Sequence, residues 1–179
     1  MIIFFSDSGV IMSRKIIGVF GAGNVTEAEE EYQLAFKVGH LLARHGFIVL
    51  TGGLGGTMMA ASRGAKEAGG ITVGILPGTS KTSPANKYVD IAIYTGMGEA
   101  RNAINVKSCK AAIAIGGEYG TLSEISLALK GGCPIILLHS WALTSHSGLK
   151  PPARLVAETA EQAVLMAAGA VKKISNQFL

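Results

Sequence analysis

Two clusters of glycine residues mark places where this chain could hold a charged ligand. The first is TGGLGGTMMA at residues 51–60 and the second is IGGEYGTLSE at residues 115–124; each follows an apolar run and leads into a helical pattern. Glycine lets backbone N–H groups approach a bound group closely, and the first amides of a helix have no partner inside it. Together with the positive end of the helix dipole, such amides bind anions, typically phosphate. The two clusters therefore predict a ligand that carries a phosphate.

Other turns of the chain extend this predicted binding site. A third glycine cluster ends the apolar run KIIGVFGAG at residues 15–23, but it does not complete the dinucleotide motif G-x-G-x-x-G, because Thr26 occupies the sixth place. No Gly-Lys-Ser/Thr follows the glycines, so a Walker A loop is excluded. On these loops we expect the ligand to contact Gly21, Gly23, Gly52, Gly53, Gly55, Gly56, Thr57, Gly116, Gly117, Gly120 and Thr121.

Two charged residues accompany the glycine clusters. Arg101 falls in the first turn of a predicted helix, where a cation opposes the helix dipole. Contact with a ligand anion would explain this position, and a surface salt bridge is the alternative. Glu124 follows Thr121 by three residues, which is the spacing of a capping box, so its carboxylate either caps its own helix or faces the anion site.

The elements that must position these residues alternate strictly along the chain. Apolar runs predict strands, and amphipathic runs predict helices, two of which open with capping-box pairs, Thr26 with Glu29 and Thr159 with Gln162. This alternation predicts an α/β fold: a doubly wound, mostly parallel, Rossmann-like sheet of about six or seven strands with helices on both faces. We expect strands at 15–23, 47–53, 71–78, 90–96, 111–117, 134–140 and 154–159, and helices at 26–46, 56–69, 99–110, 121–132 and 160–174.

Composition limits the class of protein. The chain has 179 residues, of which 49% are hydrophobic and 16% charged, so we expect one globular Rossmann-like domain at 14–179 and an N-terminal extension at 1–13 that could be disordered. The net charge of +4 forms no basic stripe, which argues against nucleic acid, and no apolar run is long enough for a membrane span. Cys109 and Cys133 lack metal-site spacing, so we expect no metal, buried free thiols and a cytoplasmic location.

Three motifs together resemble one known superfamily. TGGLGGTMMAAS, GEARNAINV and AIAIGGEYGTLSEISLAL, in this order and spacing, resemble the Rossmann-like LONELY GUY proteins, whose members have often been labelled lysine decarboxylases. The resemblance covers about residues 14 to 175. One branch splits nucleoside 5′-monophosphates into free base and ribose 5-phosphate, with the motif P-G-G-x-G-T-x-x-E and an upstream arginine. For that branch the resemblance implies Arg101 and Glu124 as the catalytic pair and Gly116, Gly117, Gly120 and Thr121 as the phosphate cradle.

The chain departs from the hydrolase branch and looks more like a second branch. Ile115 replaces the motif's proline, Glu118 is an additional residue, and Asn102 rather than lysine follows Arg101. In these features the chain resembles the molybdenum cofactor carrier proteins. Members of that branch bind a phosphate-bearing pterin without converting it and assemble as homo-tetramers. The resemblance implies that the ligand also contacts Met58, Pro77, Gly78, Arg101, Asn102 and Glu124.

We therefore expect a carrier for a phosphorylated small molecule that needs no cofactor for catalysis. The bound ligand would be the molybdenum cofactor (molybdopterin) or a nucleoside monophosphate, and the expected partners are that ligand and further copies of the chain, as a dimer or a tetramer. Two alternatives stay open: a phosphoribohydrolase that uses Arg101 and Glu124, and a nucleotide-sensing regulatory protein. Whether the chain is an enzyme is left open, although a lysine decarboxylase is disfavoured because no lysine is placed to form a Schiff base.

Overall fold

The strands of the chain form one parallel sheet. The computed structural model describes residues 14–144, 146, 148 and 155–176, so the expected N-terminal extension at 1–13 lies outside the described residues. The strand order is β4-β3-β2-β1-β5-β6-β7, and every neighbouring pair is parallel. The strands are β1 (Ile16–Gly21), β2 (Ile48–Thr51), β3 (Thr72–Leu76), β4 (Ile91–Tyr94), β5 (Ala111–Ile115), β6 (Ile135–Leu138) and β7 (Val156–Ala157).

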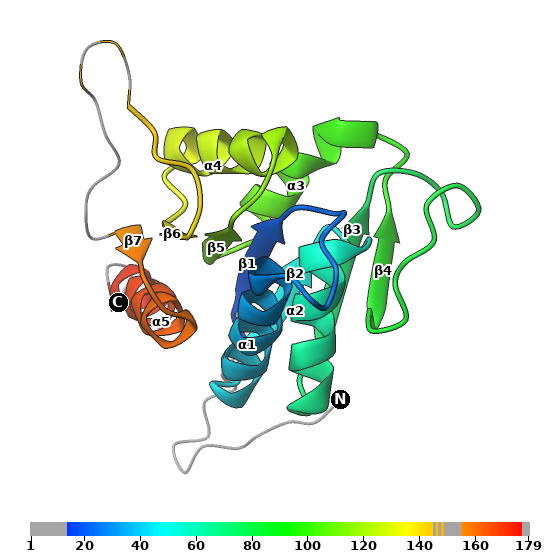
Figure 1. The fold of residues 1–179 in the computed structure, drawn as a ribbon, viewed down its shortest axis with the longest axis horizontal. Coiled ribbons are helices and arrows are strands. Elements are labelled where there is room, and N and C mark those ends of the chain that lie inside the picture. The colour runs from blue at the N-terminus through cyan, green and yellow to red at the C-terminus, as the bar shows by residue number, and fades with distance from the viewer. Residues whose placement is uncertain (1–13, 145, 147, 149–154, 177–179) are drawn as a thin grey trace.

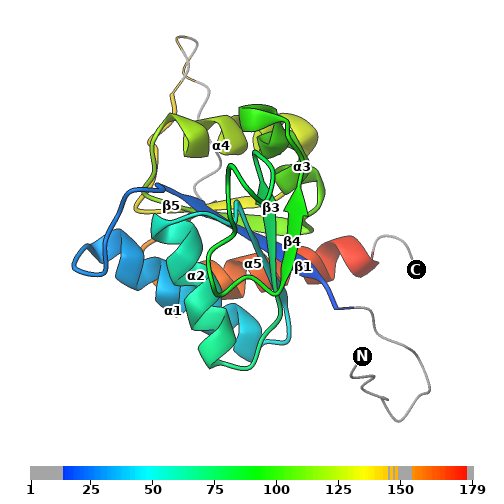
Figure 2. The same ribbon diagram turned by 90° about the vertical axis from the view of Figure 1, so that its right-hand side faces the viewer.

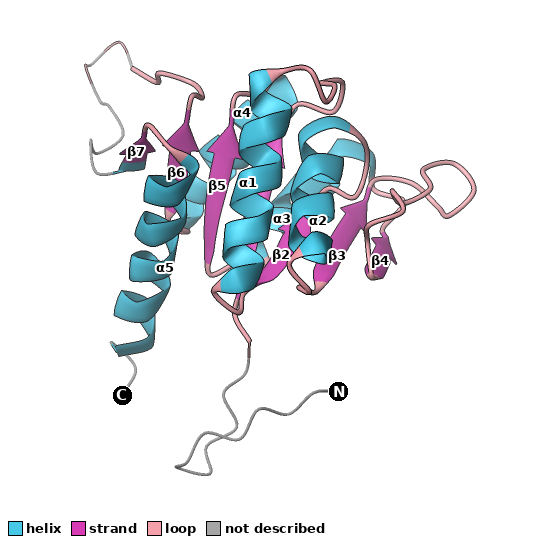
Figure 3. Ribbon diagram, turned by 60° about the horizontal axis from the view of Figure 1, so that its bottom comes forward, coloured by secondary structure: helices cyan, strands magenta, loops and turns pink. Residues whose placement is uncertain are grey.

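Helices cover both faces of this sheet (Figure 1). One layer consists of α1 (Glu30–Arg44), α2 (Gly56–Glu67) and α5 (Ala160–Asn176). The opposite layer consists of the short 3-10 helix η1 (Gly98–Arg101), α3 (Asn102–Lys107) and α4 (Tyr119–Gly131). Figure 2 shows the sheet between the two layers, and Figure 3 shows α1, α2 and α5 in front of the strands. The predicted doubly wound α/β fold with six or seven strands is confirmed.

Side chains along the central strands alternate between two apolar cores. On β1, Ile17 and Val19 are fully buried in the core that contains residues of α1, α2 and α5. Phe20 points to the other face, where it is clustered with Val106 of α3 and Ile125 of α4. Because both faces of a parallel strand are covered by helices, the strand sequence reads as a continuous apolar run. This arrangement explains the high apolar and low charged content of the chain.

The edge strand β4 differs from the other strands. Its residues are apolar, yet Ile91 and Ile93 are 51% and 45% exposed and Tyr94 is 41% exposed. Among the described residues β4 pairs only with β3, so its other edge has no strand partner. The apolar composition of β4 is therefore not a sign of burial, because this strand lies at the edge of the sheet.

Two predicted capping boxes have different outcomes. Thr159 begins α5 as expected, because the N–H of Gln162 donates to its hydroxyl at 3.2 Å. The predicted helix start at Thr26 is wrong, because α1 begins at Glu30 with Glu29 as the N-cap residue. The Glu29 carboxylate accepts hydrogen bonds from the N–H and the hydroxyl of Thr26, at 2.7 and 2.9 Å, and thereby closes a turn that precedes the helix.

None of the helices in the described ranges is long and apolar enough to cross a bilayer.

Candidate functional site

A cleft of about 180 Å³ opens where the strand order reverses. It lies at the carboxyl ends of β1, β2 and β5, and such a reversal point is where ligands bind in open α/β sheets. We call it the switch-point cleft and define it by its lining residues. These are Phe20, Gly21, Ala22, Gly23, Gly52, Leu54, Met58, Glu99, Arg101, Asn102, Glu118, Gly120, Thr121 and Glu124.

The structure brings together about half of the ligand residues predicted from the sequence. The predicted residues that line the switch-point cleft are Gly21, Gly23, Gly52, Met58, Arg101, Asn102, Gly120, Thr121 and Glu124. The predicted residues outside the lining are Gly53, Gly55, Gly56, Thr57, Pro77, Gly78, Gly116 and Gly117. Sequence reasoning missed five lining residues, of which Glu99 and Glu118 could have been found because both are charged residues inside the quoted motifs.

The turn between β2 and α2 is filled by atoms of the chain itself. The N–H of Thr57, in the first turn of α2, donates to the carbonyl of Ala22 at 2.9 Å, and Thr57 is fully buried. Gly56 adopts a φ of +58°, and a Cβ there would overlap the same Ala22 carbonyl. A Cβ at Gly21 would meet the side chain of Thr57. These glycines therefore let the turn after β1 pack against the start of α2.

Gly52 makes room for the side chain of Arg101. A Cβ at Gly52 would overlap the Arg101 guanidinium and the sulfur of Met58. Arg101 is only 6% exposed, and no hydrogen-bond partner in the described part of the chain reaches its Nε or Nη1. Burial lowers the pKa of Arg101, although the charges of Glu124 and Glu99 act in the opposite direction. A buried charge without hydrogen-bonded partners is costly, and a ligand anion in the cleft would remove that cost.

The turn between β5 and α4 is open toward the cleft. Helix α4 begins at Tyr119, and its N-cap residue, Glu118, makes no side-chain capping bond. The first amides of a helix have no partner inside it, and no atom lies near enough to restrict a side chain at Gly120. The start of α4 therefore presents free amides and open space beside Arg101, which are the elements of an anion site.

The space beside the two glycines that precede this helix is occupied by other side chains of the protein. A Cβ at Gly116 would overlap the carboxylate of Glu31, and one at Gly117 would overlap the side chain of Thr121. Both have positive φ, +50° and +101°, which favours glycine. Burial, followed by the charges of Glu29, Glu118 and Glu30, raises the pKa of Glu31.

Glu124 faces the switch-point cleft and does not cap its helix. Since α4 begins at Tyr119, Glu124 lies in the second turn, and the capping-box interpretation is wrong. The Nδ2 of Asn105 donates to Glu124 Oε1 at 2.7 Å, and the residue is 6% exposed. Burial raises the pKa of Glu124 to about 7, against the opposing effects of the Asn105 hydrogen bond and the Arg101 charge. Near neutral pH this carboxyl group can therefore give or take a proton.

Asn102 connects the segment that carries Arg101 to the start of α4. Its Nδ2 donates to the carbonyl of Gly120 at 3.4 Å and to the hydroxyl of Ser123 at 3.2 Å. The adjacent Arg101 is thereby held beside the first turn of α4. The alternative interpretation of Arg101, a surface salt bridge, is excluded by its burial.

Within the described ranges, no group of three or more His, Cys, Asp or Glu side chains could hold a metal ion. Both cysteines are free, but Cys109 and Cys133 are partly rather than fully buried. Burial raises the pKa of each thiol, so neither is an activated nucleophile.

Comparison with known proteins yields one family and several close relatives. The SLOG cluster4 family matches residues 14–172. An uncharacterised protein of Archaeoglobus fulgidus is 45% identical over 152 residues, which cover 83% of this chain and 91% of that protein. The solved molybdenum cofactor binding protein of Rippkaea orientalis is 39% identical, with a TM-score of 0.76, over 92% of this chain and 99% of that one. The molybdenum cofactor carrier protein of Chlamydomonas reinhardtii is 37% identical, with a TM-score of 0.76, over 89% and 99%.

Proposed function

The chain belongs to the SLOG cluster4 family, and from this premise we propose that it binds and carries a phosphorylated small molecule of the molybdenum cofactor type. The resemblance to LONELY GUY proteins, and within them to molybdenum cofactor carriers, is confirmed by the family match and by the solved relatives. The observation that carries the proposal is the buried Arg101 guanidinium, which lines the switch-point cleft and whose Nε and Nη1 have no hydrogen-bond partner among the described residues. A phosphate is the ligand group that best satisfies such a fork of donors.

In the proposed complex the phosphate lies between Arg101 and the start of α4. The guanidinium donates charge-assisted hydrogen bonds from one side, and the amides of Gly120 and Thr121 donate from the other. Gly120 leaves space for the phosphate because it lacks a side chain. Residues 53, 55, 56, 57, 116 and 117 shape the surrounding turns without lining the cleft.

The rest of the cleft suits a ring that carries N–H groups. Three carboxyl groups line the cleft, those of Glu99, Glu118 and Glu124, and only one cation faces them. The Asn24 side chain holds Glu118 by donating to its Oε1 at 3.1 Å. Carboxylates accept hydrogen bonds from the amino and ring N–H groups of a pterin or a purine, and they repel additional phosphates. The ligand is therefore expected to be a monophosphate with a nitrogen-rich ring rather than a polyphosphate.

A second function follows from the pKa of Glu124. A carboxyl group that titrates near pH 7, beside an arginine, is suited to acid–base or electrostatic work at a glycosidic bond. A phosphoribohydrolase that cleaves a nucleoside 5′-monophosphate would use Glu124 at the ribose and Arg101 at the phosphate. The carrier proposal and the hydrolase proposal share one phosphate position and differ only in whether a bond is cleaved.

The proposal includes assembly of the chain into a dimer or a tetramer. The apolar side chains of β4 are exposed, and Met97, just before η1, is 51% exposed. An exposed apolar edge strand is normally covered in a stable protein. A charge on β4, introduced by Ile93→Lys, is therefore expected to lower the molar mass measured by light scattering. An unchanged mass would remove β4 from the interface.

The experiment that separates the two functions begins with the protein as purified. The mass of the small molecule that co-purifies is measured first, and then release of ribose 5-phosphate from a panel of nucleoside monophosphates. A phosphate-bearing pterin without turnover supports the carrier. Release that is lost in Glu124→Gln, a variant of nearly the same shape, supports the hydrolase. If the protein neither retains nor binds any phosphorylated small molecule, both functions are excluded.

A further inference from the structure

Asn86 is the residue through which the segment 79–90 contacts the turn after β2. Its backbone N–H donates to the carbonyl of Gly53 at 2.9 Å. Its side-chain Nδ2 donates to the carbonyls of Gly53 and Leu54, at 3.2 and 2.8 Å. The backbone N–H and the side-chain amide of Asn86 thus bind two successive carbonyls of a glycine-rich turn.

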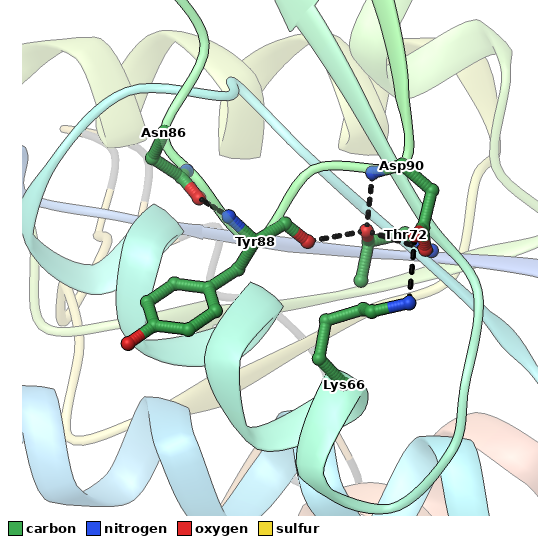
Figure 4. Close-up of polar contacts among 5 residues, drawn as sticks. All are labelled: Lys66, Thr72, Asn86, Tyr88 and Asp90. Carbon is green, nitrogen blue, oxygen red and sulfur yellow. Dashed lines mark hydrogen bonds and ion pairs between the residues drawn. The ribbon is translucent and has the colours of Figure 1, made fainter.

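Asn86 is itself held in place by the chain that follows it (Figure 4). Its Oδ1 accepts from the N–H of Tyr88 at 3.0 Å. The carbonyl of Tyr88 accepts from the hydroxyl of Thr72 at 2.6 Å, and Thr72 also exchanges hydrogen bonds with Asp90. Lys66 completes this network through an ion pair with Asp90 at 2.6 Å. The segment is therefore fastened to β3 and α2, and Asn86 meets the turn from a fixed position.

The turn that Asn86 holds forms one wall of the switch-point cleft. Gly52 provides the space for the Arg101 guanidinium, and Leu54 lines the same cleft. Four of the five residues at 52–56 are glycine, and such a segment has many accessible backbone conformations in the absence of restraints. A small rotation of this backbone would change the space at Gly52, and the guanidinium would move with it.

We propose that Asn86 is a positioning residue that aims Arg101 at the ligand anion by fixing the Gly53–Leu54 carbonyls. This inference rests on the proposed function, because it takes Arg101 as the contact to the phosphate. It adds a residue that does not itself line the cleft and that belongs to a separate segment of the chain.

Asn86→Asp tests the proposal with a side chain of the same shape. The aspartate side chain still accepts from the N–H of Tyr88, but it cannot donate to the carbonyls of Gly53 and Leu54, so only the backbone hydrogen bond to Gly53 remains. Loss of this restraint is expected to weaken binding of a pterin monophosphate about tenfold, as for one lost hydrogen bond to a charged group. Thr82→Ala is the matched control, because it removes hydrogen bonds between Thr79 and Thr82 in the same segment, away from the cleft. The control is expected to stay within about twofold of the original affinity, a free-energy change well below that of one hydrogen bond.

A double variant shows whether Asn86 acts through Arg101. In an Arg101→Met background, Asn86→Asp should have no further effect on affinity, although it should still lower the melting temperature. Equal losses of affinity with and without Arg101 would overturn the proposal. An Arg101→Met variant with unchanged affinity would instead contradict the proposed function.

A measurement without ligand keeps the two failures apart. Phenylglyoxal modifies accessible guanidinium groups, and mass spectrometry of peptides reports the rate at Arg101. The Asn86→Asp variant should react several-fold faster at Arg101 than the unaltered protein or Thr82→Ala. Equal rates in all three would show that Asn86 does not hold Arg101, whatever the protein binds.

Discussion

The turns after β2 and after β5 are similar in sequence and different in what occupies the space that their glycines leave. After β2, the Ala22 carbonyl and the Arg101 guanidinium fill that space. After β5, Glu31 and Thr121 fill the space at Gly116 and Gly117 in the same way, but the space at Gly120 is open, and the first turn of α4 faces the cleft. A glycine shows that something must come close to the backbone, but that group can belong to the chain as well as to a ligand.

The two turns complement each other because Arg101 lies between them. The turn after β2 accommodates a buried cation, and the turn after β5 offers helix amides. Neither turn alone provides both the charge and the open space that a phosphate needs. The following predictions test this division, beginning with the group that both turns share.

Arg101→Met should cause the largest loss of ligand affinity. Methionine fills similar space without the charge, so two charge-assisted hydrogen bonds are lost, and the Kd for a pterin monophosphate should rise about 100-fold. The unliganded variant should unfold at the same or a higher temperature, because it loses a buried charge whose Nε and Nη1 have no hydrogen-bond partner in the part of the chain that the structure describes. Fluorescence of Trp141, the only tryptophan, can report binding, since its ring lies 6.1 Å from that of Tyr119 at the start of α4.

Lys107→Met is the matched control for this prediction. Lys107 is an exposed cation on α3 and does not line the switch-point cleft. Its loss changes the net charge by the same amount, so affinity should stay within about twofold, as for a screened surface charge. Equal weakening by both variants would mean that general attraction, rather than a contact at Arg101, holds the ligand.

Glu124, on the helix that follows β5, should make the stability of the protein depend on pH. Its pKa rises from 4.5 to about 7 in the folded protein, so folding favours the protonated form. The stabilisation is complete below pH 4.5 and is lost as the pH rises through 7, by about 2 kcal/mol between pH 5 and 8. Chemical unfolding at a series of pH values measures this loss. The difference between the unaltered protein and Glu124→Gln isolates it from other groups, and parallel curves would contradict the prediction.

The fold could be predicted from the sequence because it depends on local patterns. Each predicted helix and strand exists, and its type follows from apolar periodicity and from glycines at its ends. The exposure of the β4 side chains could not be predicted, because the apolar composition of this strand does not show that it lies at the edge of the sheet. The start of α1 was misplaced because the Thr26 and Glu29 pair closes a turn before the helix.

The site could be predicted only in part, because its residues meet through long-range contacts. That Gly52 makes space for Arg101 depends on a packing between residues 49 positions apart, which no local motif encodes. The role of Glu124 depended on whether α4 begins at Tyr119 or at Thr121, a difference of two residues. Arg101, Asn102 and Glu124 do line one cleft, and their contact with a ligand stays a prediction.

Gly52→Ala should weaken both stability and binding. The added methyl group would overlap the Arg101 guanidinium, so the turn or the arginine must move, at a cost of about 1–3 kcal/mol in the free energy of unfolding. A displaced guanidinium should also raise the Kd about tenfold, as for the loss of one charged hydrogen bond. Denaturant unfolding and titration with a pterin monophosphate measure the two effects. If the variant has normal stability and normal affinity, the space at Gly52 is not needed to accommodate Arg101.

Gly120→Ala should have the smallest effect and the opposite sign on stability. Apart from its chain neighbours and the backbone of α4 itself, no atom of the described residues lies within 4 Å of the position that a Cβ would take, and alanine is favoured over glycine inside a helix. The unliganded protein should therefore gain up to about 0.5 kcal/mol, while the methyl group, which points into open space beside the cleft, should raise the Kd several-fold. If Gly120→Ala gains stability and loses affinity while Gly52→Ala loses both, then Gly120 leaves space for a ligand and Gly52 leaves space for a side chain of the protein. If both variants instead lose stability equally, the open space after β5 is not available to a ligand, and the contrast between the turns fails.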